Sequence, residues 1–217
     1  EEQFYRTNKE GTTSGTLRPA DEPKLTIKNC ILRNSGDATK GQVPTVLIKK
    51  GGGETLVVNS LFHHNQGNPL EAVNTKVVNC TFALNKGHLS LSEETEMYEN
   101  NEQSTDLTSE LHNSIIWRDK SSETGGQYTG VSTGKKMTYN AITGLAETED
   151  ECHNIGLSDT NADLFAGPNF VDPDQGDFHV GISTRILSQG SKEKYEALVP
   201  YFAIYPEYAN NNKGKVG

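Results

Sequence analysis

The sequence predicts an all-β fold, a parallel β-helix in which short strands stack as successive coils of a solenoid. One phrase occurs twice, at residues 57–67 and 77–87, with Val, Val, Asn, Phe, Asn and Gly in matching places. The two copies begin 20 residues apart, which is a period typical of solenoid repeats. A hydrophobic content of 33% is low for a globule, but it fits the narrow core of a solenoid.

Further copies of the phrase extend the repeat toward both ends of the chain. Residues 25–36 hold an earlier copy, residues 111–119 hold one with Asp119 at the second Asn position, and residues 137–144 hold a degenerate one. The first Asn of the copies falls at Asn29, Asn59, Asn79, Asn113 and Asn140. Because the spacing varies, we expect the 20-residue step to be the minimal coil and the longer steps to carry surface insertions.

The phrase itself predicts a strand, a bend and a second strand, because apolar residues alternate with period two on each side of the Asn. In the copy at residues 57–67, Val57, Ser60 and Phe62 would point inward, with Asn59 at the bend. Asn tolerates the left-handed conformation of a tight bend. Asn side chains stacked coil over coil can also form hydrogen-bonded ladders. We therefore expect an apolar column with Asn residues at its corners.

The three cysteines do not indicate a disulfide framework. Cys30 and Cys80 occupy the same position of the repeat two coils apart, which separates them by about 9–10 Å. That distance is beyond disulfide reach. We expect both to be small buried residues, interchangeable with Ser60 and Ser114, and Cys152 to be a free thiol in an acidic loop.

The chain divides into three predicted parts. Residues 1–23 are a polar leading or capping segment, residues 24–190 form the β-helix domain, and residues 191–217 form an aromatic-rich C-terminal cap and tail. We expect the cap to cover the open end of the column, since an uncapped coil exposes apolar surface and strand edges. The domain carries acidic insertions at 86–110, with a short helix near 93–100, and at 145–167.

Charge and hydropathy exclude two classes of partner. The net charge of −9 argues against nucleic acid, because no basic stripe is present to neutralise phosphates. The longest apolar runs, such as residues 201–205, are too short for a transmembrane segment. The first residues do not form a signal peptide, so the sequence fits either a mature, processed protein or a cytosolic one.

Three parts of the sequence carry a resemblance to a known family. They are the Asn-Cys/Ser-x-Phe-x-x-Asn phrases at 59–65 and 79–85, the coil at 113–117, and the closing segment at 167–180. They resemble right-handed parallel β-helix proteins of bacterial surfaces, the adhesin-like type common in Bacteroidetes. The Phe-x-x-Asn phrase is also similar to the short repeat of chlamydial polymorphic outer-membrane adhesins. The C-terminal cap departs from the family at residues 183–187, where Ser-Pro-Ala-Ile-Asp is usual.

The resemblance covers residues 24–190 and implies a right-handed β-helix in a secreted or outer-membrane-associated cell-surface protein. Fold does not by itself imply activity, and no set of residues here matches a lyase or glycosidase active site. We predict a non-enzymatic module that binds a glycan or a host surface, as a monomer or as part of a larger surface protein. The alternatives are a carbohydrate-active enzyme, either a polysaccharide lyase or a glycoside hydrolase, and a purely structural spacer.

The candidate binding residues lie outside the inward pattern of the repeat. Trp117 is expected to point outward beside Arg118, either as a sugar-stacking surface or covered by the 86–110 insertion, since large aromatics are mostly buried. His63 and His64 are expected to face solvent, and Lys49 completes the set.

No catalytic residues are predicted, and Ca²⁺ is the one cofactor that the sequence suggests. Asp172, Asp174 and Asp177 lie close together around Gly176, and carboxylate oxygens at short spacing suit Ca²⁺. The alternative is that these acids end turns of the closing coil. The six histidines show no spacing typical of a metal site.

Overall fold

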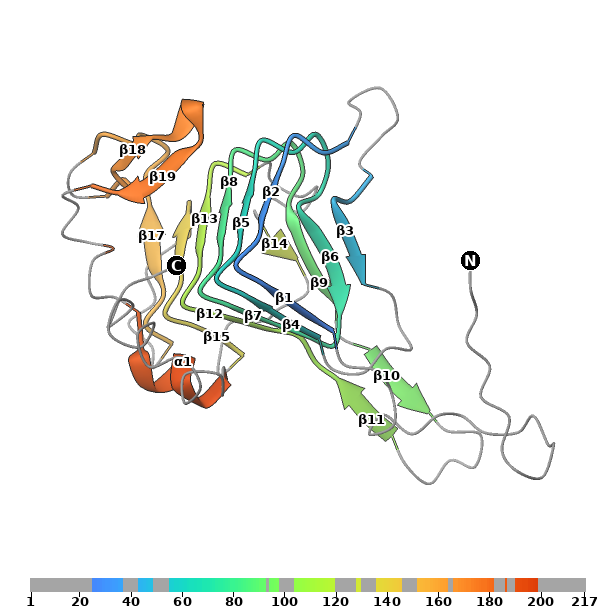
Figure 1. The fold of residues 1–217 in the computed structure, drawn as a ribbon. Coiled ribbons are helices and arrows are strands. Elements are labelled where there is room, and N and C mark those ends of the chain that lie inside the picture. Colours follow the sequence, from blue (N-terminus) through green and yellow to red (C-terminus); the bar gives the residue numbers. More distant parts are fainter. Residues whose placement is uncertain are drawn as a thin grey trace, which may run out of the picture.

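The computed structural model describes residues 25–36, 43–48, 55–92, 94–97, 104–119, 128–129, 136–145, 152–163, 166–181, 186 and 190–198. The described elements are almost all β-strands, and most of them stack in parallel sheets (Figure 1). The architecture is all-β and consistent with the predicted β-helix solenoid.

Three parallel sheets run along the stack, and the chain visits them in turn. The first sheet contains β1 (Thr26–Lys28), β4 (Thr55–Val58), β7 (Thr75–Val78), β12 (Glu110–His112) and β15 (Met137–Thr138). The second contains β2 (Ile31–Arg33), β5 (Leu61–His63), β8 (Thr81–Ala83), β13 (Ile115–Trp117), β16 (Ala141–Thr143) and β17 (Ile155–Leu157). The third contains β3 (Val46–Ile48), β6 (Leu70–Val73), β9 (Leu89–Ser92) and β14 (Tyr128–Thr129).

The strand register follows the sequence repeat. Val57 pairs with Val77, and Phe62 pairs with Phe82. The predicted inward positions are confirmed, because Val57 and Phe62 are fully buried and Ser60 is nearly so. The rings of Phe62 and Phe82 stack 4.9 Å apart between centroids. Each such side chain contributes about 1.5–3 kcal/mol by leaving water, so repetition of the phrase builds a continuous core.

The corner between the first and second sheets, called here the first corner, is made by one left-handed residue per coil. These residues have φ between 50° and 61°, and they are Asn29, Asn59, Asn79, Asn113, Tyr139 and His153. The predicted Asn bends are therefore confirmed in four coils. The bend predicted at Asn140 in the fifth coil is wrong by one residue. Because Thr138 pairs with His112, Tyr139 lies at the bend and Asn140 occupies the inward position that holds a small residue in other coils.

Residues 152–157 form a further coil that the sequence prediction had treated as part of an insertion. β17 pairs in parallel with β16, with Ala141 opposite Ile155. Cys152, which was expected in an acidic loop, lies buried at the start of this coil and forms no disulfide. Cys30 and Cys80 form no disulfide, as expected; Cys80 is buried as predicted, whereas Cys30 in the first coil is only half-buried.

At the corner between the second and third sheets, an amide ladder lies inside the coil. Asn65 Nδ2 donates to Asn85 Oδ1 at 2.9 Å, and Asn85 Nδ2 donates to Asp119 Oδ1 at 3.1 Å. The left-handed residue here precedes the ladder residue, as His64 does for Asn65. The predicted ladders are thus present, since Asn79 Nδ2 also donates to Asn59 Oδ1 at 2.7 Å.

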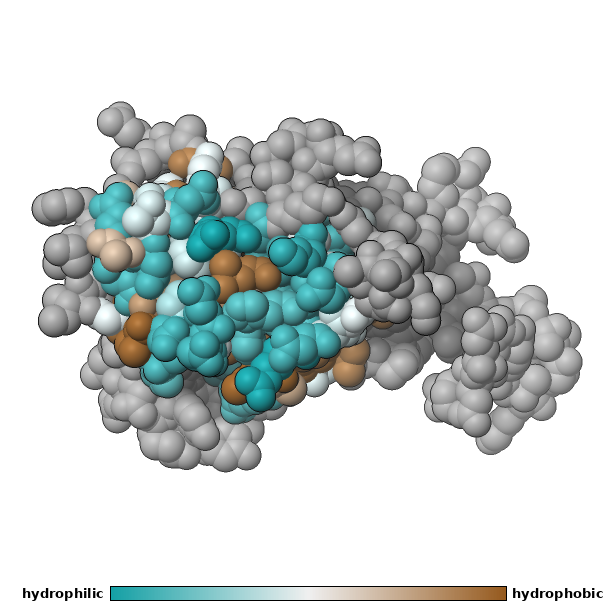
Figure 2. Space-filling model, turned by 90° about the horizontal axis from the view of Figure 1, so that it is seen from above, coloured by the Kyte–Doolittle hydropathy of each residue, from teal (hydrophilic) through white to brown (hydrophobic). Residues whose placement is uncertain are grey.

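The 86–110 insertion contains an antiparallel hairpin of β10 (Glu94–Met97) and β11 (Ser104–Leu107), so the short helix expected near residues 93–100 is wrong. Seen from above in Figure 2, the described surface is mainly hydrophilic with small hydrophobic areas. Within the described ranges, no helix has the length and apolar character needed to cross a membrane.

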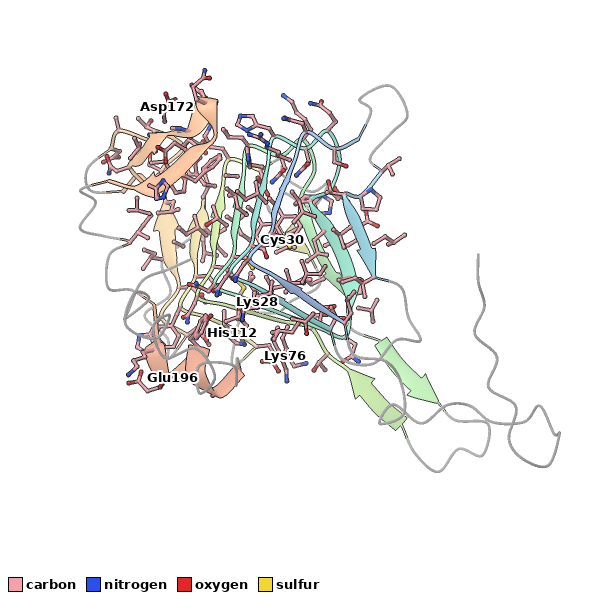
Figure 3. All side chains as sticks on the ribbon, viewed as in Figure 1. Lys28, Cys30, Lys76, His112, Asp172 and Glu196 are labelled. Atoms are coloured by element: carbon pink, nitrogen blue, oxygen red, sulfur yellow. The ribbon has the colours of Figure 1, made fainter. Side chains whose placement is uncertain are left out.

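The C-terminal elements cover two sides of the stack. β18 (Phe170–Asp172), the 3₁₀-helix η2 (Pro173–Gln175) and β19 (Asp177–Val180) form a hairpin whose apolar residues pack on the outer face of the second sheet. Helix α1 (Lys192–Leu198), marked by Glu196 in Figure 3, lies below the first sheet. Its Tyr195 packs against Val58 and Val78. The described part of the predicted cap, α1, therefore covers the face of the first sheet, whereas the sequence suggests the open end of the column.

Candidate binding groove on the second sheet

A groove of about 770 Å³ runs over the early coils on the outer face of the second sheet. One side is the row of first-corner residues, the floor is the outward start of β2, β5 and β8, and the other side is the turn of the C-terminal hairpin. The lining residues are Asn29, Cys30, Ile31, Asn59, Ser60, Leu61, Asn79, Thr81, Gln175, Gly176, Asp177, Phe178 and His179.

The groove exists because the hairpin covers only part of the second sheet. Over the later coils, Phe170 packs edge-on against Trp117, with centroids 5.5 Å apart, in a cluster that includes Ala83, Ile115 and Ala141. Over the early coils the outward row becomes progressively more open, since Thr81 is 7% exposed, Leu61 is half-buried and Ile31 is 67% exposed. The hairpin therefore forms a wall beside a floor whose apolar part, Ile31 and Leu61, is accessible at the first two coils.

The amides of the first corner follow the coils in register with this floor. Ile31 pairs with Leu61, and Leu61 pairs with Thr81, so each floor residue has an Asn two residues before it. Asn59 Oδ1 accepts from Asn79 Nδ2 and from the Tyr195 hydroxyl at 3.0 Å. Within the described part of the chain, no hydrogen bond engages Asn59 Nδ2, Asn79 Oδ1 or the Asn29 amide. The row thus presents unused donors and acceptors.

The hairpin wall carries an exposed histidine–carboxylate pair. Asp177 Oδ1 accepts hydrogen bonds from the His179 backbone N–H at 3.0 Å and from His179 Nδ1 at 2.6 Å. These two bonds lower the pKa of Asp177 because they stabilise its ionised form. With the proton of a neutral imidazole on Nδ1, the Nε2 lone pair of His179 is exposed, and its side chain is 90% accessible. An imidazole held in this tautomer can accept a proton or a hydrogen bond.

The tight turn of this wall requires glycine at position 176. Gly176 has φ 87°, and a Cβ at this position would lie 3.1 Å from His63 Cε1. A side chain here would be strained by the backbone conformation, and it would also press on the coil beneath the hairpin.

The expected solvent exposure of His63 is wrong. His63 is 3% exposed, because Phe178 covers it with ring centroids 4.9 Å apart. Its Nδ1 lies 2.8 Å from Nδ1 of His64, which is half-buried. The pKa of His63 is lowered to about 4, first by burial and then by the nearby charges of His64 and Arg33. These histidines therefore support the hairpin and do not line the groove.

Of the two alternatives for Trp117, the structure supports a covered ring and not an exposed one. Trp117 is 1% exposed, and its Nε1 donates to the Ser158 carbonyl oxygen at 3.1 Å. It does point outward from its coil, and among the described residues Phe170 and the last coils pack on it. Arg118 is exposed, with its guanidinium 5.2 Å from the centre of the Trp117 ring. Lys49 lies outside the described residues.

The aspartates proposed for Ca²⁺ serve turns of the hairpin. Asp172 Oδ1 accepts from the Gln175 N–H at 3.3 Å and caps η2, and Asp177 binds His179. Figure 3 shows Asp172 at the outer end of the hairpin. Among the described residues, no group of three His, Cys, Asp or Glu side chains is placed to hold a metal ion. The contacts match the alternative interpretation of turn-ending acids, and Ca²⁺ binding by Asp172, Asp174 and Asp177 stays a prediction.

Sequence reasoning assigned Asn29, Asn59 and Asn79 to bends and ladders alone, and it missed their place along a groove. One signal was available. Ile31 and Leu61 follow these Asn residues at outward positions of the strands, and an apolar residue at an outward position beside a bend indicates a covered or binding surface.

No family model, no curated protein and no solved structure matches the chain.

Proposed function

We propose that this chain is a secreted or cell-surface module of the adhesin-like, right-handed β-helix type, and that it binds glycan on a host or neighbouring surface without catalysis. The observation that supports this function is the groove, in which a row of amides borders an aliphatic floor. Amides offer both donors and acceptors to sugar hydroxyls. The floor of Ile31 and Leu61 offers apolar contact to the C–H faces of sugar rings, as in typical ligand sites.

The amide row is preorganised, which favours binding. Asn29, Asn59 and Asn79 hold φ between 50° and 55°, and their backbone N–H groups donate to the next coil at 3.0–3.2 Å. A ligand therefore does not have to order the backbone that carries these amides, and that reduces the entropic cost of association.

The test is a glycan array with residues 1–217, followed by calorimetry on each glycan that binds. Ile31→Asp places a carboxylate on the exposed floor and is expected to weaken binding at least about tenfold, the equivalent of roughly 1.4 kcal/mol. Leu47→Asp is the matched control, because Leu47 is 50% exposed on the third sheet, outside the groove. The proposal fails if no glycan binds, or if the two variants bind equally.

The second candidate is a carbohydrate-active enzyme, and the Asp177–His179 pair favours it. A histidine oriented by a carboxylate is a common general base, and this one lies on the groove wall. Incubation with a panel of neutral and uronic-acid polysaccharides, read as new reducing ends and as unsaturated products, separates the two functions. Turnover that His179→Gln abolishes would establish the enzyme, whereas binding without turnover favours the module.

A further inference from the structure

We propose that the groove takes an uncharged, extended glycan chain that lies along the stacking axis, with successive sugar units beside Asn29, Asn59 and Asn79. This inference rests on the glycan-binding function proposed above and names its ligand class. Three properties of the groove lead to it, namely the repeat of its lining, its charge, and the kinds of hydrogen-bonding groups it leaves unused.

The groove lining repeats from coil to coil, and this repeat defines the direction in which a ligand would lie. The pairs Ile31–Leu61 and Leu61–Thr81 are in register across parallel strands, and neighbouring strands lie about 4.8 Å apart. The Asn row repeats with the same step. A ligand that contacts the whole row must cross the strands and present a similar group at each coil, and one step is close to the length of a pyranose unit. A linear glycan chain meets this requirement.

The charge of the described lining disfavours an anionic ligand. Among the described residues, the groove lining holds one carboxylate, Asp177, and no Lys or Arg. Arg33 lies at the far end of β2, where its charge acts on His63. Sites for carboxylates or sulfates use Arg or Lys to compensate the ligand charge. Here Asp177 and the net charge of −9 would repel such a ligand.

The side-chain amide groups that the Asn row leaves unpaired favour a ligand that carries hydroxyls. Asn59 leaves a donor, its Nδ2, and Asn79 leaves an acceptor, its Oδ1, while the Asn29 amide leaves both. A hydroxyl both donates and accepts, whereas an ionised carboxylate only accepts. The alternation of donor and acceptor along the row therefore fits a chain of neutral sugars.

The first experiment compares two series of oligosaccharides, each from one to six units, by calorimetry with residues 1–217. The neutral series contains β-glucan, mannan and xylan oligomers, and the acidic series contains oligogalacturonates and alginate oligomers. Affinity for neutral oligosaccharides is expected to increase with chain length up to about three sugar units, one for each Asn of the row, and to stay constant for longer chains. Acidic oligomers are expected to bind at least about tenfold more weakly, since Asp177 repels them and no described Lys or Arg of the lining pairs with their carboxylates.

The second experiment removes one amide and keeps the bend. Asn29→Gly is suitable because glycine adopts positive φ without strain, and Asn29 has φ 54°. Loss of one ligand hydrogen bond, about 0.5–1.5 kcal/mol, is expected to weaken binding of the neutral trisaccharide roughly 2- to 12-fold. Asn34→Gly is the matched control, because Asn34 has the same φ of 54° and follows β2 in the same coil but does not line the groove.

The outcomes separate this inference from the function on which it rests. If acidic glycans bind and neutral ones do not, the ligand class is wrong although glycan binding stands. The axial placement is wrong if the affinity for neutral glycans is independent of chain length, or if Asn29→Gly and Asn34→Gly weaken it equally. If no glycan of either series binds, the proposed function fails together with the inference.

Discussion

Phe178 in β19 lies against His63 in β5, with 4.9 Å between the ring centroids, and this contact joins the groove wall to the coil stack. The buried imidazole has a pKa near 4, well below its unfolded value of about 6.5. Its neighbours on the coil side are His64 and Arg33, and the hairpin above it carries Asp174, Asp177 and His179. The attachment of the hairpin should therefore depend on pH.

The sign of this dependence follows from proton linkage. Between pH 6.5 and pH 4 the unfolded chain binds a proton at His63 and the folded chain does not, so acidification favours unfolding. The stability contributed by neutral His63 is complete above pH 6.5 and is lost as the pH falls through 4, up to roughly 3 kcal/mol. Urea unfolding at several pH values should show a steeper loss for the native protein than for His63→Gln. The exposed His179→Gln is the control, and parallel curves for all three proteins would contradict the prediction.

Asp119 closes the inner amide ladder, and its replacement by Asn should stabilise the protein at neutral pH. The carboxyl is 4% exposed, and burial raises its pKa well above the ordinary value despite the hydrogen bonds from Asn85. A raised pKa in the folded state means that stability is complete below the unfolded pKa and is lost as pH rises through the folded pKa.

Asp119→Asn removes the cost of burying an ionised carboxylate. The Nδ2 of the new amide would face the Phe82 carbonyl oxygen, as Asn85 Nδ2 faces the Phe62 carbonyl oxygen at 3.0 Å. We expect a gain of roughly 1–2 kcal/mol at pH 7.5, on the scale of one relieved buried polar group. The gain in unfolding free energy should vanish below pH 4. Urea unfolding at pH 7.5 and again below pH 4 measures it under both conditions. The prediction would be contradicted if the variant were less stable than the native protein at both pH values.

The strand register could be predicted from the sequence because side-chain size and alternation repeat with each coil. Val57 and Val77 fill the same place in the column, and Asn59 and Asn79 tolerate the same left-handed bend. The fifth coil escaped prediction because Asn suits both a bend and a small inward position. In this coil Tyr139 makes the bend, while Asn140 lies inside and accepts the Ser114 N–H at 2.9 Å.

The site was less predictable, since it depends on where distant parts of the chain dock. Alternation predicted that Trp117 points outward, but its burial comes from Phe170, which belongs to the hairpin and not to the repeat. The same hairpin buries His63 and leaves Ile31 open. The local sequence pattern predicts which side chains lie inside each coil. The groove, in contrast, depends on how much of the second sheet the C-terminal hairpin covers.

Phe82 is a test of the core, because it is fully buried and stacks on Phe62 at 4.9 Å. Phe82→Ala leaves a cavity between coils and is expected to cost about 3–5 kcal/mol of unfolding free energy. Val171→Ala is the control, since Val171 is 63% exposed and surface changes usually stay within about 0.5 kcal/mol. Chemical denaturation measures both, and similar midpoints for the two variants would argue against a continuous core.

Tyr195 fastens helix α1 to the first corner, and its hydroxyl donates to Asn59 Oδ1 at 3.0 Å. Burial raises the pKa of this phenol, so the hydroxyl remains a donor at neutral pH. Tyr195→Phe keeps the packing on Val58 and Val78 and removes the hydrogen bond, at an expected cost of about 1 kcal/mol. Hydrogen exchange should become faster in residues 192–198 and stay unchanged in β5 and β8. Tyr139→Phe, at a half-buried ring stacked on His153, should leave α1 unaffected; equal effects of both changes would mean that the Tyr195–Asn59 bond does not hold the helix.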